Sequence, residues 1–99
     1  MFVALERLLN LQTGYRRRFQ IDGKHLLLLV VEVQAVLLDS RCPHQGVSLE
    51  TASLVGRVLR CSRHGVEFDV LSGQALNLNC PGLRHLPLVY HGDRIGIDV

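Results

Sequence analysis

Two short loops each pair one cysteine with one histidine, and this pairing constrains the chain more than any other feature of its sequence. The residues are Cys42 and His44 in the first loop and Cys61 and His64 in the second, spaced C-x-H and C-x-x-H. Together they offer two thiolates and two imidazoles. A 2Fe-2S cluster in which two cysteines hold one iron and two histidines hold the other needs this set of ligands. We therefore predict that these four residues bind metal.

Three other interpretations of the four residues stay open at this point. A structural zinc site also uses two cysteines and two histidines, but it usually pairs Cys with Cys and His with His. Zinc tolerates the interleaved order, so a zinc-stabilised binding module is one alternative. A catalytic Cys/His pair needs a third, orienting group, and nothing singles out one cysteine as its nucleophile. Buried cysteines and surface histidines without metal would leave the matched spacing to coincidence.

Beyond the ligands, the chain resembles Rieske iron-sulfur proteins, and in particular the small freestanding Rieske-type ferredoxins of oxygenase systems. The resemblance continues through His44-Gln45-Gly46 and through His64-Gly65-Val66-Glu67-Phe68-Asp69, with Gly73 a few residues later. It covers nearly the whole chain. It implies a Rieske-type antiparallel β-sandwich or small barrel, with a cluster-binding subdomain from about residue 41 to residue 73.

The resemblance also implies a cofactor and a role. One 2Fe-2S cluster per chain would be held by Cys42, His44, Cys61 and His64. The protein would be an electron carrier and not itself an enzyme, taking one electron from a reductase and passing it to an oxygenase or similar terminal enzyme by transient docking at the two histidines. A small regulatory or assembly subunit, like that of an assimilatory nitrite reductase, is the alternative role. Loss of the ligands would favour that alternative, and all four are present.

The departures from the Rieske pattern bear on the redox potential. High-potential members carry a disulfide between positions that match Val47 and Arg63, and hydroxyl groups at positions that match Val66 and Phe68. Because hydrogen bonds to the cluster raise its potential, their absence implies a value toward roughly −150 mV. The positive charges of Arg41 and Arg63 favour the reduced cluster, so we expect a modest upward correction.

Length, charge and cysteine usage limit the remaining possibilities. The 99 residues suffice for one domain, 1–99, and leave no room for the separate mononuclear iron domain of a Rieske oxygenase. Eleven basic and nine acidic residues are interspersed, which indicates neither a nucleic-acid surface nor a membrane patch. No secretion signal is visible, and two of three cysteines are assigned to metal, so we expect a cytoplasmic location. The third, Cys80, is interpreted as a packing residue.

The pattern of short apolar runs and turn dipeptides predicts an all-β chain. Asp22-Gly23 separates 18–21 from 24–31 and is typical of a type I′ hairpin turn. A second turn is expected near 32–34, before a strand over 35–38 that leads into the first Cys/His loop. Strands are also expected over 87–90 and 94–99. Only 4–11 has any helical spacing, and we assign no helix there. The basic run Arg16 to Arg18 is interpreted as a solvated strand edge.

Overall fold

The computed structural model describes residues 1–43, 46–62 and 65–99, and it consists of antiparallel strands and a single-turn 3-10 helix. Three sheets form, in the orders β1-β10-β9, β2-β3-β4-β8 and β5-β6-β7. The elements are β1 (Phe2–Arg7), η1 (Leu8–Asn10), β2 (Arg16–Ile21), β3 (Lys24–Val31), β4 (Gln34–Asp39), β5 (Ser53–Val55), β6 (Val58–Arg60), β7 (Glu67–Asp69), β8 (His85–Leu86), β9 (Val89–His91) and β10 (Arg94–Asp98). The predicted all-β, antiparallel class is confirmed.

The turn between β2 and β3 has the predicted form. Asp22 and Gly23 both have positive φ angles, 51° and 76°, and Ile21 pairs with Lys24 across them. A type I′ turn requires positive φ at both central residues, which Asp-Gly adopts readily. The next turn is one residue shorter than predicted, because Val31 already pairs with Gln34.

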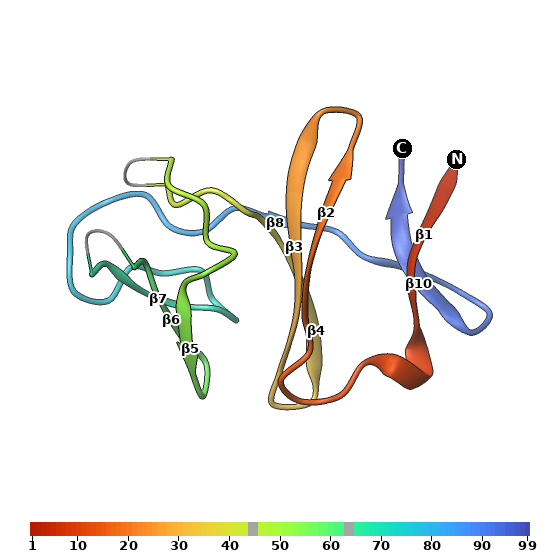
Figure 1. Ribbon diagram of the computed structural model, residues 1–99, viewed down its shortest axis with the longest axis horizontal. Helices are drawn as coiled ribbons and strands as arrows, with labels where there is room; N and C mark the ends of the chain where they lie inside the picture. Colours follow the sequence, from red (N-terminus) through yellow and green to blue (C-terminus); the bar gives the residue numbers. More distant parts are fainter. Residues whose placement is uncertain (44–45, 63–64) are drawn as a thin grey trace.

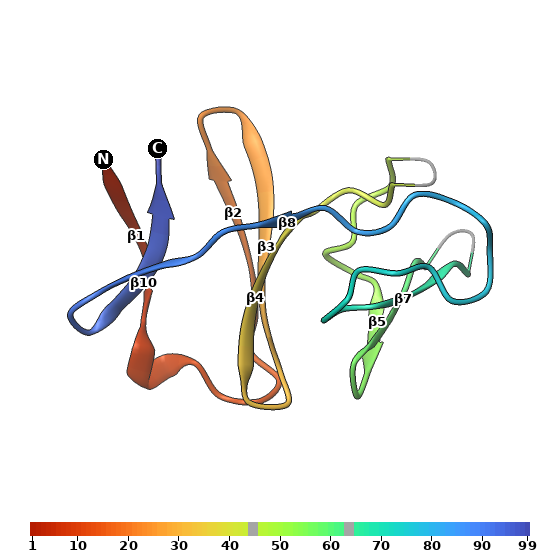
Figure 2. The same cartoon turned by 180° about the vertical axis from the view of Figure 1, so that it is seen from behind.

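The sheet of β2, β3, β4 and β8 lies between the other two sheets, as Figures 1 and 2 show from opposite sides. The apolar run Leu26 to Val31 is therefore buried on both faces. Leu27, Leu29 and Val31 pack toward the small β5-β6-β7 sheet, whereas Leu26 and Leu28 pack toward β1 and β10. Side chains alternate between the faces of a strand, so an uninterrupted apolar run is expected only for a strand covered on both sides.

The run Arg16 to Arg18 lies on β2, at the edge of the central sheet, as predicted. It is more than a solvated edge, however. Arg16 Nη1 donates hydrogen bonds to the backbone carbonyls of Glu50 and Ala52, at 3.0 and 2.6 Å. Arg18 lies 3.5 Å from the Glu50 carboxylate. These contacts connect the central sheet to the segment that follows the first Cys/His loop.

The N-terminal segment with helical spacing forms β1 and the 3-10 turn η1. Glu6 on β1 accepts hydrogen bonds from the Asn10 side chain, the Arg7 backbone amide and the Tyr15 hydroxyl. These bonds, the one from Asn10 foremost, lower the pKa of Glu6 from 4.5 to about 2. No helix within the described ranges 1–43, 46–62 and 65–99 is long and apolar enough to cross a bilayer.

Candidate metal centre

The first Cys/His loop leaves the central sheet directly after β4 and is closed by its own backbone. The Cys42 amide donates to the Val47 carbonyl at 2.7 Å, and the Gly46 amide donates to the Cys42 carbonyl at 2.7 Å. Outside these bonds, Arg41 and Ser48 form an antiparallel bridge. Gly46 has a φ of 71°, which a residue with a Cβ adopts only at a cost.

The second loop repeats this frame between β6 and β7. The Cys61 amide donates to the Val66 carbonyl at 2.8 Å, and the Gly65 amide donates to the Cys61 carbonyl at 2.9 Å. Arg60 and Glu67 pair outside them, and Gly65 has a φ of 69°. The two loops therefore share one backbone geometry at these positions. The underlying pattern is visible in the sequence: each loop has Arg-Cys, and Gly-Val begins four residues after the cysteine.

His44 and His64, the two predicted imidazole ligands, lie outside the described residues, as do Gln45 and Arg63. The matching backbone hydrogen bonds nonetheless align the two loops, Cys42 with Cys61 and Gly46 with Gly65. His44 is the second residue after its cysteine and His64 the third after its own, within loops of equal length from Cys to Gly.

Both predicted sulfur ligands lie in one hydrophobic core. Cys42 and Cys61 are buried, with 1% and 0% of their surface exposed, and they share this core with Leu59, Phe68 and Leu27 of the central sheet. Two thiolates in an apolar, water-poor setting suit iron and inorganic sulfide, because soft thiolate ligands select iron-sulfur clusters and the surrounding shell controls solvent access. The described part of the donor set thus fits a 2Fe-2S cluster.

Asn77 supports the second loop from outside it, a contact that the sequence analysis missed. Its side-chain Oδ1 accepts a hydrogen bond from the Glu67 amide at 2.9 Å, and its Nδ2 donates to the Gly65 carbonyl at 2.9 Å. The guanidinium of Arg60 lies against the other side of Gly65, where an added Cβ would come within 3.1 Å of Nη2. Nothing in the sequence marks this asparagine among its neighbours.

The strand that follows the second loop is anchored as predicted for Phe68-Asp69. Phe68 is fully buried. The Asp69 carboxylate accepts hydrogen bonds from the backbone amides of Leu71 and Ser72 and forms a two-point contact with Arg57, at 2.9 and 3.2 Å. The Arg57 contact is the main cause that lowers the pKa of Asp69, and the backbone bonds add to it. Phe68 and Asp69 therefore stabilise the strand after the second loop through packing and hydrogen bonds.

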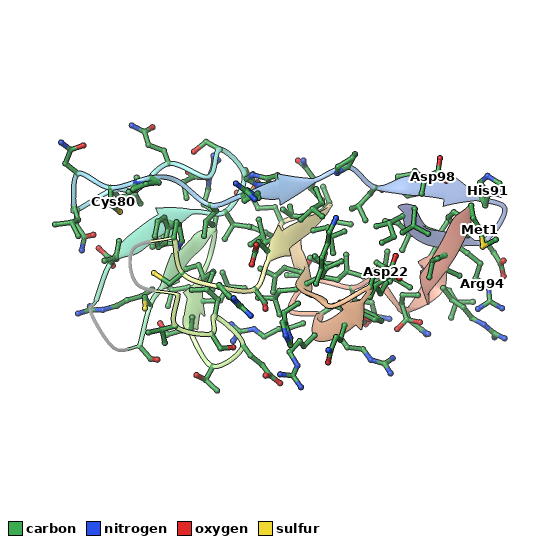
Figure 3. The ribbon with its side chains drawn as sticks, turned by 90° about the horizontal axis from the view of Figure 1, so that it is seen from above. Met1, Asp22, Cys80, His91, Arg94 and Asp98 are labelled. Carbon is green, nitrogen blue, oxygen red and sulfur yellow. The ribbon has the colours of Figure 1, made fainter. Side chains whose placement is uncertain are left out.

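The segment from Gly73 to β8 returns past both loops. The Leu83 amide donates to the Gly73 carbonyl at 2.7 Å, and the His85 ring lies 2.7 Å from the Val70 carbonyl through Nε2. Cys80 is partly buried and packs against the core that holds the two other cysteines, in line with its interpretation as a packing residue. Figure 3 shows it at the end of the molecule opposite Met1, His91 and Arg94.

Within residues 1–43, 46–62 and 65–99, no group of three or more Cys, His, Asp or Glu side chains could hold a metal ion. Two of the four predicted ligands fall outside these ranges. The structure thus brings Cys42 and Cys61 into one core, and the complete ligand set stays a prediction.

A family model and the curated relatives of this chain indicate the same protein family. The model of the Rieske [2Fe-2S] domain matches residues 1–88. The chain is 31% identical over 80 residues to the ferredoxin component of the naphthalene 1,2-dioxygenase system of Pseudomonas aeruginosa, covering 80% of this chain and 77% of that protein. It is 39% identical over 87 residues to the ferredoxin component of the alkene monooxygenase system of Xanthobacter autotrophicus, covering 87% and 71%.

The fold agrees with this match. A ferredoxin of Sphingomonas yanoikuyae B1 superposes with a TM-score of 0.84 at 21% identity, covering 100% of this chain and 99% of that one. The sequence matches to curated relatives span from 54% to 77% of the relatives' own lengths.

Proposed function

The chain belongs to the Rieske [2Fe-2S] family, and on this basis we propose that it is a one-electron carrier that delivers electrons from a reductase to a terminal oxygenase. Relatives named as ferredoxin components of dioxygenase and monooxygenase systems support this role. We propose further that residues 1–99 act as one domain, that the carrier is not itself an enzyme, and that it works in the cytoplasm.

The observation that carries the proposal is the repeated loop frame, with one buried cysteine at the same position of each loop. Cys42 and Cys61 would hold one iron through sulfur, and His44 and His64 would hold the other through nitrogen. Bound there, a 2Fe-2S cluster supplies a centre that takes up and releases a single electron.

The surrounding residues tune and protect this site. Val66 and Phe68 are both buried and carry no hydroxyl group, so neither side chain donates a hydrogen bond toward the loops. Fewer donors leave the reduced state less stabilised, which supports a potential toward roughly −150 mV at the low end of the Rieske range. The apolar core beneath the loops, including Leu59 and Leu83, keeps water away from the two sulfur atoms.

The direct test is an EPR spectrum of the dithionite-reduced protein, purified without oxygen, with iron and sulfide analysis of the same sample. We expect a rhombic signal of the nitrogen-ligated 2Fe-2S type, with two irons and two sulfides per chain. A colourless protein that contains zinc, or no metal, would overturn the proposal and favour a binding module.

Two histidine variants test the ligand assignment. His64→Cys should retain a cluster with an altered spectrum and a lower potential, because a thiolate replaces a neutral imidazole. His91→Cys is the matched control, since His91 lies at the far end of the molecule and stacks on Phe2. An unchanged spectrum in His64→Cys would contradict the role of His64 as a ligand.

A further inference from the structure

A groove of about 310 Å³ lies beside the first ligand loop, and two arginines are among the residues that line it. Cys42 and Pro43 of the loop form part of its lining, together with Pro81 and Gly82 from the returning segment. Arg41 and Arg84 also line it, and both are exposed. We call this surface the Arg41–Arg84 groove.

The backbone holds the two arginines in place through one acidic residue. The Asp39 amide donates to the Arg84 carbonyl at 2.9 Å, and the Asp39 carboxylate accepts a hydrogen bond from the Arg41 amide at 3.0 Å. This carboxylate is the only acidic side chain that lines the groove among the described residues. A second hollow of about 280 Å³ shares Asp39, Arg41 and Arg84 and continues the surface to Lys24.

The basic side chains of this surface form no ion pair with the residues that the structure describes. In the described part of the chain, Arg17, Arg18, Arg57 and Arg94 each form an ion pair, whereas Arg41, Arg84 and Lys24 form none. Two guanidinium groups beside one carboxylate leave a net positive charge in a concave surface. A concave surface of one sign concentrates the field and attracts the opposite charge.

We propose that the Arg41–Arg84 groove docks a carboxylate-bearing face of the protein redox partner, and so guides that partner to the ligand loops. Guanidinium groups bind carboxylates through paired hydrogen bonds, which fixes orientation as well as proximity. A carboxylate bound there would lie directly beside Cys42 and Pro43. This inference rests on the proposed electron-carrier function and specifies the chemistry of its partner.

The test compares charged oxidants of the reduced protein by stopped flow under anaerobic conditions. Ferricyanide takes one electron from the protein and becomes ferrocyanide, and hexaamminecobalt(III) takes one electron and becomes the cobalt(II) complex. The double variant Arg41→Gln/Arg84→Gln removes the two charges. Arg7→Gln is the matched control, because Arg7 is exposed, forms no ion pair among the described residues, and pairs across strands with Arg94 at the far end.

At about 10 mM salt, the double variant should react with ferricyanide on the order of 10-fold more slowly than the unmodified protein, and faster with the cobalt complex. The difference should largely vanish at about 1 M salt, where the Debye length is roughly 3 Å. Arg7→Gln should behave like the unmodified protein. Equal rates for the double variant at low salt, or the same loss in Arg7→Gln, would overturn the proposal.

A second measurement does not depend on electron transfer. A fluorescein-labelled peptide of ten glutamates should bind the unmodified protein at low salt, as followed by fluorescence anisotropy, and bind the double variant more weakly. Undiminished binding to the variant would overturn the docking role. Iron, sulfide and EPR analysis of each sample separates the two proposals: a missing cluster contradicts the carrier function, whereas an intact cluster with unchanged rates contradicts the groove alone.

Discussion

Asn77 offers a sharp test of how the second ligand loop is held. Its amide bridges the Gly65 carbonyl and the Glu67 backbone amide with two hydrogen bonds of 2.9 Å. Each such bond contributes about 0.5–1.5 kcal/mol, and both are exposed to competing water, so the lower part of the range applies. Asn77→Ala should therefore lower the free energy of unfolding by about 1–2 kcal/mol. Asn79→Ala is the matched control, because Asn79 is exposed in the same segment and makes no hydrogen bond with any described residue.

Asn77→Asp tests the two hydrogen bonds of Asn77 separately, because only one of them depends on the protonation of the new carboxyl group. The introduced carboxylate keeps an acceptor for the Glu67 amide but places negative charge against the Gly65 carbonyl and near the Glu67 carboxylate, which now lies 3.5 Å from Asn77 Nδ2. Protonation restores a donor. The destabilisation should thus be present at neutral pH and shrink as the pH falls toward about 4, near the ordinary range of aspartate. Asn77→Ala should show no such recovery.

Guanidinium unfolding followed by circular dichroism at both pH values measures these differences. Hydrogen exchange of the Glu67 amide gives a local readout, in which a loss of about 1.4 kcal/mol appears as a tenfold loss of protection if the bond is lost by local opening. If Asn77→Ala matched Asn79→Ala, or if Asn77→Asp failed to recover in acid, the bridging role would be refuted.

Further substitutions test the backbone and the distal network. Gly46→Ala and Gly65→Ala should each destabilise by about 1–2 kcal/mol in denaturant titrations, because both positions have positive φ; an unchanged midpoint would contradict the loop geometry. Gly96→Ala should separate β10 from β1, since a Cβ there would collide with the Val3 carbonyl, and β1 amides should lose hydrogen-exchange protection. The pKa of Glu6 is lowered to about 2, so the ionised carboxylate stabilises the fold above about pH 4.5, and this contribution is lost as the pH falls toward 2. In Glu6→Gln, the thermal midpoint should therefore depend less on pH between about 4.5 and 2 than in the unmodified protein.

Local signals account for the parts of the fold that the sequence predicts. Asp22-Gly23 determines its own turn, because the required φ angles belong to those two residues. The run Leu26 to Val31 predicts a buried strand, although it leaves open which side chains face which neighbouring sheet. The repeated Arg-Cys and Gly-Val pairs in the sequence indicate two loops with the same backbone hydrogen bonds.

Contacts between distant segments account for what could not be predicted. Asn77 reaches Gly65 only because the segment after β7 passes back beside the second loop, and its composition gives no sign of that path. Arg16 was expected to be solvated because arginine on an edge strand usually is, but its guanidinium finds two backbone carbonyls from the segment after the first loop. Side-chain to backbone contacts of this kind depend on the assembled fold.

Ion pairs are distributed unevenly between the two ends of the molecule. Away from the ligand loops, Met1 pairs with Asp98, Arg17 with Glu6 and Arg94 with Asp93, and Arg7 is the exposed cation there without an ion pair to a described residue. Beside the first loop, Arg41 and Arg84 form no ion pair with any described residue. Exposed charges left without internal partners contribute little to folding, but they act at long range on an approaching protein. Neutralising them with a nearby engineered carboxylate should therefore slow partner association while leaving the unfolding free energy nearly unchanged, and a large loss of stability would show that these arginines serve the fold instead.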